Sequence, residues 1–303
     1  MATLHVYHDH AKWIADALRL AAGERHEIVA WSEPEPFVAA LPSIEILVTQ
    51  GPPRGVFAAA TNLRLIHGLG AGVDDLLPAE DLSKDVVICG ARGVFAAEAS
   101  EHAIAMMLAL ERGLPAMFER QRAHEWKMFG VGKLEGRTAG IVGVGAIGER
   151  IMKVAAALGM EVLGTALRPR SGHVPLDELL ARSDHVVVCT PRTPATLNLI
   201  DARRMKRGSF LVSLGRGGVV NETALLAALH EGHLGGAALD VFEDEPLPAD
   251  SAWWSAPNTI VTPHIAGYGR HYLERVVAVA LDNVDRLLRG EPLLHRVDRA
   301  LGY

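Results

Sequence analysis

Short apolar runs recur along the first third of the chain and are separated by longer segments with a helical spacing of apolar residues. Each run is too short for a helix and is bounded by polar or turn-forming residues, as buried strands are. The runs lie at Leu4 to Tyr7, Glu27 to Trp31, Ile44 to Thr49, Leu63 to His67 and Val86 to Cys89. His10 to Ala22, between the first two runs, has the spacing of a helix. Strands that alternate with helices predict a parallel sheet with crossover helices.

A second series with the same alternation begins at Thr138. Its further runs lie at Glu161 to Leu163, His185 to Cys189, Phe210 to Leu214, Gly236 to Val241 and Thr259 to Val261. We therefore predict an α/β protein with two doubly wound, parallel-sheet units in one chain.

Two segments outside this alternation are predicted to be helices. Ala97 to Arg112 is apolar on nearly all sides but is too short to span a bilayer, so we expect it to be buried, in the core or in a subunit interface. Its position would also let it link the two units. Leu273 to Leu288 is strongly amphipathic and ends at Arg289-Gly290, and we expect it to return to the first unit.

Composition is typical of a soluble globular protein with about two domains: the chain has 303 residues, of which 49% are hydrophobic and 22% charged. A formal net charge of -6 and the lack of a long basic block argue against nucleic acid or an anionic membrane surface as a partner. The first residues lack the basic start and apolar core of a signal peptide, and no apolar stretch approaches the length of about 18 residues that a membrane helix needs. These observations predict a cytoplasmic protein.

Cysteine and histidine usage indicates neither disulfides nor a metal site. Cys89 and Cys189 each lie in an apolar run, as small core residues of a protein in a reducing compartment do. None of the 14 histidines has a metal-ligand spacing with a neighbouring carboxylate on a convincing helix, so we predict no metal.

A glycine-rich turn follows the strand that begins at Thr138. The pattern Gly143-x-Gly145-x-x-Gly148 precedes a helical spacing of apolar residues from Glu149 to Leu158. In a dinucleotide-binding turn, the first glycine permits the tight turn, the second lets main-chain amides approach a pyrophosphate, and the third lets the helix pack against its strand. The helix N-terminus also favours an anion. The turn therefore predicts a bound dinucleotide.

Polar side chains that could carry chemistry follow three later strands. Arg216, Glu245 and His264 each come shortly after an apolar run. The carboxyl ends of successive parallel strands converge on one ligand crevice, so these side chains can meet there. Taken singly, each also fits a structural role, as a surface arginine, a solvated loop acid and a capping histidine.

From about Leu63 to about Gly267, the chain resembles the D-isomer-specific 2-hydroxyacid dehydrogenase family. The motifs that carry the resemblance are Gly70 to Asp74, Ala97 to His102, Gly143 to Gly148, Arg216-Gly217, Asp240 to Pro246 and Thr262 to His264. It implies two Rossmann-like domains with a cleft between them, one a flavodoxin-like substrate domain and the other an NAD(P)-binding Rossmann domain. Residues 1–97 would form the substrate-binding domain, 98–268 the inserted dinucleotide-binding domain, and 269–303 a C-terminal helix that returns to the substrate-binding domain. A homodimer through the cofactor domains is also implied.

The resemblance implies roles for individual residues as well. Arg216 would bind the substrate, His264 would be the acid/base with Glu245 as its partner, and Asp240 would lie at the nicotinamide. These roles suit a 2-oxo acid, because a guanidinium can grip its carboxylate while polarising the C2 carbonyl. A histidine can protonate the C2 oxygen near neutral pH, and a carboxylate beside it stabilises the imidazolium.

Main-chain groups complete the predicted contacts, because small residues let the main chain approach a ligand closely. The predicted substrate contacts are Leu69, Gly70, Ala71 and Gly72, together with Arg216 and His264. The predicted cofactor contacts are Gly143, Gly145, Ala146, Ile147, Gly148, Ala166, Arg168, Arg170, Thr190, Pro191 and Asp240.

The second strand of the cofactor domain departs from the pattern of NAD-dependent members of the family. Ala166 stands where those members carry the acid that bonds to the ribose, and Arg168 and Arg170 follow it. An acid would repel a 2′-phosphate, whereas arginines can pair with it. We therefore predict that NADPH is preferred and that NADH is possible. In the alternative interpretation, the arginines only lie on an exposed loop.

The predicted function is reduction of a small 2-oxo acid, similar to glyoxylate or hydroxypyruvate, to the D-2-hydroxy acid by hydride transfer from NADPH. In its cofactor pattern the chain resembles the glyoxylate/hydroxypyruvate reductase branch. The alternative is a dinucleotide-sensing, corepressor-like interaction protein of the same fold, which the intact Arg216, Glu245 and His264 disfavour. The sequence does not identify the acid, because Trp253 and Trp254 fit either a pocket wall or the core.

Overall fold

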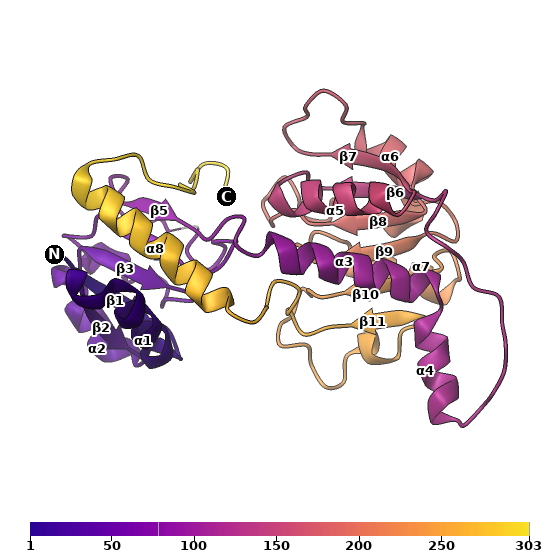
Figure 1. Ribbon diagram of the computed structural model, residues 1–303, viewed down its shortest axis with the longest axis horizontal. Coiled ribbons are helices and arrows are strands. Elements are labelled where there is room, and N and C mark those ends of the chain that lie inside the picture. Colours follow the sequence, from indigo (N-terminus) through magenta and orange to yellow (C-terminus); the bar gives the residue numbers. More distant parts are fainter. Residues whose placement is uncertain (78, 303) are drawn as a thin grey trace. The chain divides into compact units, whose positions relative to one another are not determined.

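In the computed structural model, which describes residues 1–77 and 79–302, the chain forms two compact units (Figure 1). Unit 1 consists of Met1–Phe95 and Gly269–Tyr303, and unit 2 of Ala96–Tyr268. Unit 2 is thus inserted into unit 1, since the chain leaves unit 1 after Phe95 and re-enters it at Gly269.

The sheet of unit 1 is entirely parallel. Its strands are β1 (Thr3–Tyr7), β2 (Glu27–Trp31), β3 (Ile46–Thr49), β4 (Leu65–Gly68) and β5 (Val87–Cys89). They pair in the order β2-β1-β3-β4-β5, with Leu4 in register with both Ile28 and Ile46. This is the flavodoxin-like strand order, which confirms the fold class predicted for the first unit.

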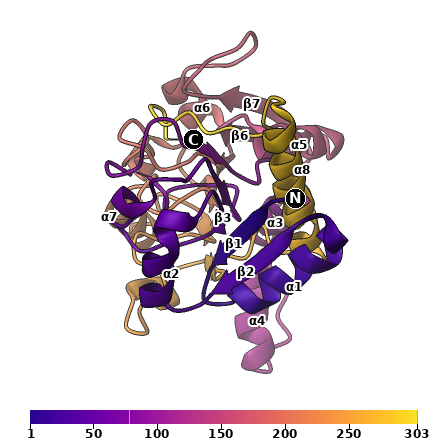
Figure 2. The ribbon, with the colours of Figure 1, turned by 90° about the vertical axis from the view of Figure 1, so that its left-hand side faces the viewer.

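Helices cover both faces of this sheet. The helices α1 (Ala11–Ala22) and α8 (Tyr272–Arg289) contact each other on one face, and α2 (Pro34–Ala40) lies on the other, as Figure 2 shows. The apolar stripe of α8 supplies Leu273, Val277 and Leu281 to the cluster that contains Leu18 of α1. The two separate stretches of chain therefore share one core.

Unit 2 contains a second parallel sheet. Its strands are β6 (Thr138–Val142), β7 (Glu161–Thr165), β8 (His185–Val188), β9 (Phe210–Ser213), β10 (Gly236–Leu239) and β11 (Thr259–Val261). They pair in the order β11-β10-β9-β8-β6-β7. The chain runs outward from β6 to β7 and resumes on the other side of β6 at β8, so the strand order reverses there. Open α/β sheets bind ligands at such a reversal.

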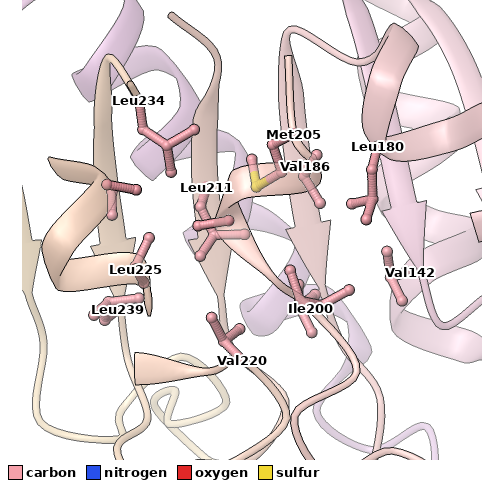
Figure 3. Close-up of a cluster of buried hydrophobic side chains, with 14 of the residues drawn as sticks. Val142, Leu180, Val186, Ile200, Met205, Leu211, Val220, Leu225, Leu234 and Leu239 are labelled. Carbon is pink, nitrogen blue, oxygen red and sulfur yellow. The ribbon is translucent and has the colours of Figure 1, made fainter. Parts of the chain in front are cut away.

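Helices also cover both faces of the second sheet. The helices α3 (Ala96–Glu111) and α5 (Ala146–Ala157) pack on one face, and α6 (Leu176–Arg182) and α7 (Glu222–His230) on the other. Figure 3 shows the second of these cores, in which Leu211 of β9 and Val186 of β8 lie beside Leu180 of α6 and Leu225 of α7. The helix α4 (Leu114–Arg122) follows α3 and projects from the unit (Figure 1). Short 3-10 helices of the chain lie at Gly23–Arg25, Leu41–Ser43, Phe57–Ala59, Ala202–Arg204 and Ala252–Ser255.

The helix α3 is less buried than its sequence predicts. It contacts α4, α5, β9 and β10, but Glu101, Ala105 and Leu108 form an exposed stripe along it. Burial in the core therefore does not extend to this stripe, because the sheet and α5 cover the helix from the other side, and its burial in a subunit interface stays a prediction. Leu108 is 39% exposed.

The two cysteines are free thiols. Burial raises the pKa of Cys89 to about 11 and that of Cys189 to about 12, so both thiols stay protonated at neutral pH. Cys189 Sγ donates a hydrogen bond to the Gly143 carbonyl oxygen at 3.0 Å. In the part of the chain that the structure describes, no helix has the length and apolarity needed to cross a membrane.

His67 is a histidine buried inside the sheet of unit 1. It is 0% exposed in β4, and neither ring nitrogen has a hydrogen-bond partner among the described residues. Burial lowers the pKa of His67 to about 4, because the imidazolium would lose its hydration inside the sheet. In an unfolded chain the pKa of histidine is about 6.5, so between these values the unfolded state binds the proton more tightly.

Unit 1 is therefore expected to lose about 3 kcal/mol of stability as the pH falls from about 6.5 to about 4. Above this window His67 is neutral in both states and adds no pH dependence. His67→Leu should flatten this part of the stability curve, and His230→Gln, at an exposed histidine, should leave it unchanged. Urea denaturation across the pH window measures the difference. An unaltered slope in His67→Leu would contradict the role of His67.

Candidate active site

The loops at one edge of the sheet of unit 2 carry most of the predicted site residues. Because all strands of the sheet are parallel, their carboxyl ends share this edge. The glycine turn follows β6, Ala166 follows β7, Thr190 follows β8, Arg216 follows β9, Asp240 and Glu245 follow β10, and His264 follows β11.

The glycine turn has the geometry that its sequence predicts. Gly143 has a φ of +103°, which side chains rarely tolerate. A Cβ on Gly148 would overlap the Gly143 carbonyl, so only glycine lets α5 start this close to β6. Ala146 and Ile147 form the first turn of α5, and Gly145 caps it. No atom of the described residues lies within 4 Å of the place where a Gly145 Cβ would be, so a ligand can approach the amides there.

Thr190 provides an independent sign of a ligand at this turn. It is 5% exposed, and its Oγ1 has no hydrogen-bond partner among the described residues. Its Cγ2 would lie 2.8 Å from a Cβ on Gly143, so the side chain of Thr190 packs against the glycine turn. An orphaned buried hydroxyl costs about 1 to 3 kcal/mol, which a bound ligand can recover. Pro191, the next residue, is half-buried, and its carbonyl oxygen accepts from Thr196 Oγ1 at 2.7 Å.

The residues expected to select the cofactor lie in the loop after β7. Ala166 is half-buried, whereas Arg168 and Arg170 are exposed. Arg170 NH1 lies 3.1 Å from Glu149 Oε1, in the first turn of α5. The structure therefore places the guanidinium of Arg170 beside the helix that the glycine turn begins.

Glu245 and His264 form a hydrogen-bonded pair. His264 Nδ1 lies 2.7 Å from Glu245 Oε2, and Glu245 Oε1 accepts from the amide of Phe242 at 2.8 Å. Both side chains are partly exposed, at 45% for His264 and 33% for Glu245. Because Glu245 occupies Nδ1, Nε2 is the ring nitrogen left to exchange a proton with a substrate. The hydrogen bond to the carboxylate also fixes the orientation of the ring.

Asp240 builds the turn that carries His264. Its carboxylate is 2% exposed. It accepts from Thr262 Oγ1 at 2.6 Å, from the Ile265 amide at 2.9 Å and from the Ala266 amide at 2.8 Å. His264 has a φ of +53°, which is unfavourable for a residue with a side chain, and these bonds hold it there. Sequence reasoning assigned Asp240 to the nicotinamide and missed this structural role.

His102 of α3 extends the same network. Its Nε2 lies 3.3 Å from Thr262 Oγ1 and 4.0 Å from Asp240 Oδ1. The sequence placed His102 in a motif but gave it no partner, because Thr262 is far away along the chain.

Arg216 lies on the loop beside the Glu245 loop. It is half-buried, and its NH1 donates to the carbonyl of Gly215 at 2.8 Å. A Cβ on Gly217 would overlap the carbonyl of Phe242, so the two loops are in direct main-chain contact. Arg216, Glu245 and His264 are thus on loops from adjacent strands, β9, β10 and β11.

The predicted substrate contacts from Leu69 to Gly72 belong to unit 1, where they follow β4. The side chain of Leu69 lies in the core of unit 1, so only its main chain is available to a ligand. Ala71 is exposed, and Gly70 and Gly72 are partly exposed. The carbonyl of Gly70 accepts from the Ala91 amide at 2.9 Å, which ties the segment to the residues after β5.

The two neighbouring tryptophans have different environments. Trp253 is 6% exposed and belongs to the core of unit 2, and its indole N–H donates to Glu222 Oε2 at 3.1 Å. Trp254 is 56% exposed and donates to the carbonyl of Pro248 at 2.8 Å. The interpretation as a core residue therefore holds for Trp253. Within residues 1–77 and 79–302, no group of three or more His, Cys, Asp or Glu side chains could hold a metal ion.

Comparison with known proteins identifies the family. Residues 104–266 match the model of the D-isomer specific 2-hydroxyacid dehydrogenase, NAD binding domain. A glycerate dehydrogenase of Methylorubrum extorquens is 33% identical over 274 residues, which are 86% of this chain and 87% of that protein.

Two crystal structures are similar over nearly the whole chain. One is an NADPH-dependent glyoxylate/hydroxypyruvate reductase of Sinorhizobium meliloti in complex with NADP and sulfate, with 28% identity, a TM-score of 0.90 and coverage of 100% of both chains. The other is a D-isomer specific 2-hydroxyacid dehydrogenase of Xanthobacter autotrophicus in complex with NADPH and MES, with 31% identity, a TM-score of 0.86 and coverage of 99% of both chains. The chain therefore belongs to the D-isomer specific 2-hydroxyacid dehydrogenase family and is an oxidoreductase that acts on CH–OH groups.

Proposed function

We propose that this enzyme reduces a small 2-oxo acid, similar to glyoxylate or hydroxypyruvate, to the D-2-hydroxy acid with NADPH. The observation that carries the proposal is the Glu245–His264 pair, with 2.7 Å between Oε2 and Nδ1, on loops next to the Arg216 loop. A proton donor with a fixed ring and a guanidinium beside it suit a substrate with a carbonyl and a carboxylate.

In the proposed reaction, the site residues of unit 2 have separate roles. When bound, the nicotinamide supplies a hydride to C2 of the acid. The electron pair of the C2–O double bond then moves to the oxygen, which takes the proton from Nε2 of His264, so one N–H bond breaks and one O–H bond forms. Glu245 holds the ring of His264 in the orientation for this transfer, and Arg216 binds the carboxylate and polarises the carbonyl. Leu69 to Gly72 remain predicted contacts of the carboxylate.

The activity test mixes the protein with NADPH and a panel of 2-oxo acids and follows the near-ultraviolet absorbance of NADPH. Turnover is expected with short acids, and His264→Gln should lower kcat at least about tenfold, because it removes the proton donor. The Kd of NADPH, measured by fluorescence, should not change. Near-normal turnover in His264→Gln would overturn the mechanism. Binding of NADPH without turnover of any acid would favour the dinucleotide-sensing alternative.

The preference for NADPH rests on the loop after β7. At position 166 an alanine replaces the acid that would repel a 2′-phosphate. Arg168 is exposed, and Arg170 lies near the start of α5. The solved relatives that hold NADP or NADPH support the same choice. Ala146, Ile147 and Pro191 remain proposed contacts of the rest of the dinucleotide.

Arg168→Ala is expected to raise the KM of NADPH about ten- to a hundredfold, because a charged hydrogen bond is worth roughly 1.5 to 3 kcal/mol. The KM of NADH should stay the same, since NADH has no 2′-phosphate. Ala166→Asp should shift the preference towards NADH. Steady-state kinetics with both cofactors measures these effects, with Arg207→Ala, at an exposed arginine elsewhere, as the control. An unchanged NADPH KM in Arg168→Ala would show that this residue does not bind the phosphate.

We also propose a homodimer through unit 2. Large apolar side chains are exposed on α4 and the segment after it: Phe118 is 52% exposed, Trp126 100% and Met128 92%. Such a group of apolar side chains on a projecting segment is typical of an interface. The exposed stripe of α3 with Leu108 lies in the same unit.

The dimer predicts a mass in light scattering of twice the 32.5 kDa of one chain. Trp126→Glu combined with Met128→Glu should shift the mass towards that of a single chain, because charges replace buried apolar contacts. Leu20→Glu, at a residue of unit 1 that is 88% exposed, is the control and should leave the mass unchanged. A dimer that survives the double substitution would rule out this surface.

A further inference from the structure

Glu222, the first residue of α7, lies between two donors that come from distant parts of the chain. Its Oε1 accepts from the amide of Glu243 at 2.6 Å, and its Oε2 accepts from the indole N–H of Trp253 at 3.1 Å. Both carboxylate oxygens are thus engaged. The sequence analysis assigned no role to this residue.

The cap of α7 does not depend on Glu222. The Asn221 side chain is the cap, since its Oδ1 accepts from the Ala224 amide at 2.9 Å. Burial, together with the charges of Glu243 and Asp244, raises the pKa of Glu222, so its position is electrostatically unfavourable. Burial and like charges disfavour a carboxylate at this position, yet an amide and an indole bind it there. This indicates a role outside its own helix.

The amide that Glu222 binds belongs to the loop of the proposed proton-transfer pair. Glu243 lies between Phe242, whose amide bonds to Glu245 Oε1, and Glu245 itself, whose Oε2 bonds to His264 Nδ1. The carboxylates of Glu222 and Glu245 therefore bind consecutive amides of one turn. Trp253 also contacts the turn, since the centroid of its ring lies 6.2 Å from that of Phe242.

We infer that Glu222 is a positioning residue, which fixes the turn from Phe242 to Glu245 so that Glu245 stays within hydrogen-bond distance of His264. The inference rests on the proposed roles of Glu245 and His264. The hydrogen bonds of Glu222 among the described residues run to the Glu243 amide and the Trp253 indole, so its proposed action on proton transfer passes through the turn. Small displacements of a catalytic group can cost about a hundredfold in rate.

Glu222→Gln is the central variant, because it keeps the shape but leaves one acceptor oxygen for two donors. We expect kcat to fall about tenfold, with the KM of the 2-oxo acid and the Kd of NADPH within about twofold of wild type. Glu222→Asp keeps the charge but withdraws both oxygens by one methylene. It should also lower kcat and leave the KM of the 2-oxo acid and the Kd of NADPH nearly unchanged. Glu231→Gln, just after the other end of α7, is the matched control and should be neutral.

Trp253→Phe supplies a rescue test. In the double variant Glu222→Gln with Trp253→Phe, the indole donor is gone, so the amide oxygen of the glutamine can bind Glu243 alone. Most of the lost kcat should return. A general loss of packing would instead make the double variant worse than either single one, because Trp253 is buried.

Two further measurements separate this inference from the proposed function. In a His264→Gln background, Glu222→Gln should cost nothing more, since its effect passes through His264. In 15N-histidine spectra of the protein without substrate, the Nδ1 resonance of His264, assigned by its loss in His264→Gln, should move in Glu222→Gln and not in Glu231→Gln.

The outcomes are distinct. If His264→Gln leaves turnover normal, the proposed function fails. If His264→Gln abolishes turnover while Glu222→Gln keeps wild-type kcat and an unmoved His264 resonance, the positioning role of Glu222 alone is overturned. An additive loss in the His264→Gln background would overturn it as well.

Discussion

Carboxylates that accept hydrogen bonds from main-chain amides fix the loops at the carboxyl edge of the unit 2 sheet. Several amides of the loops after β10 and β11 bond to side-chain carboxylates, and a buried amide without a partner is costly. Asp240 binds the amides of residues 265 and 266, Glu245 that of residue 242, and Glu222 that of residue 243. Each acid thus fixes main-chain amides of a loop, and the geometry of the edge depends on these hydrogen bonds.

This construction gathers negative charge around His264, the proposed proton donor. Such charge would repel an anionic substrate. In the proposed mechanism, the attraction comes from a different loop, the one that carries Arg216. Gly217 lets this loop contact the carbonyl of Phe242, so the cationic and anionic parts of the edge share one frame. The acids fix the turns that carry His264 and Glu245, and Arg216 is the proposed substrate contact.

Features that repeat at fixed spacing were predictable from the sequence, and features that depend on distant partners were not. Apolar runs predicted the strands, and glycine spacing predicted the turn before α5. The helices α4 and α6 were not predicted, because segments of nine and seven residues are too short for a helical spacing of apolar residues to stand out. Arg216, Glu245 and His264 stood out because each follows a strand. Glu222 did not, since Glu243 and Trp253 reach it only in the folded chain.

The insertion of unit 2 sets the order in which the two units can be completed during synthesis. All of unit 2, Ala96–Tyr268, leaves the ribosome before α8 does. The α1 face of the first sheet stays partly uncovered until then, because Val277 and Leu281 of α8 belong to the apolar cluster that buries Leu4. Chains usually fold their first domain first. In this chain, one apolar face of the first sheet is still partly uncovered while the second domain folds.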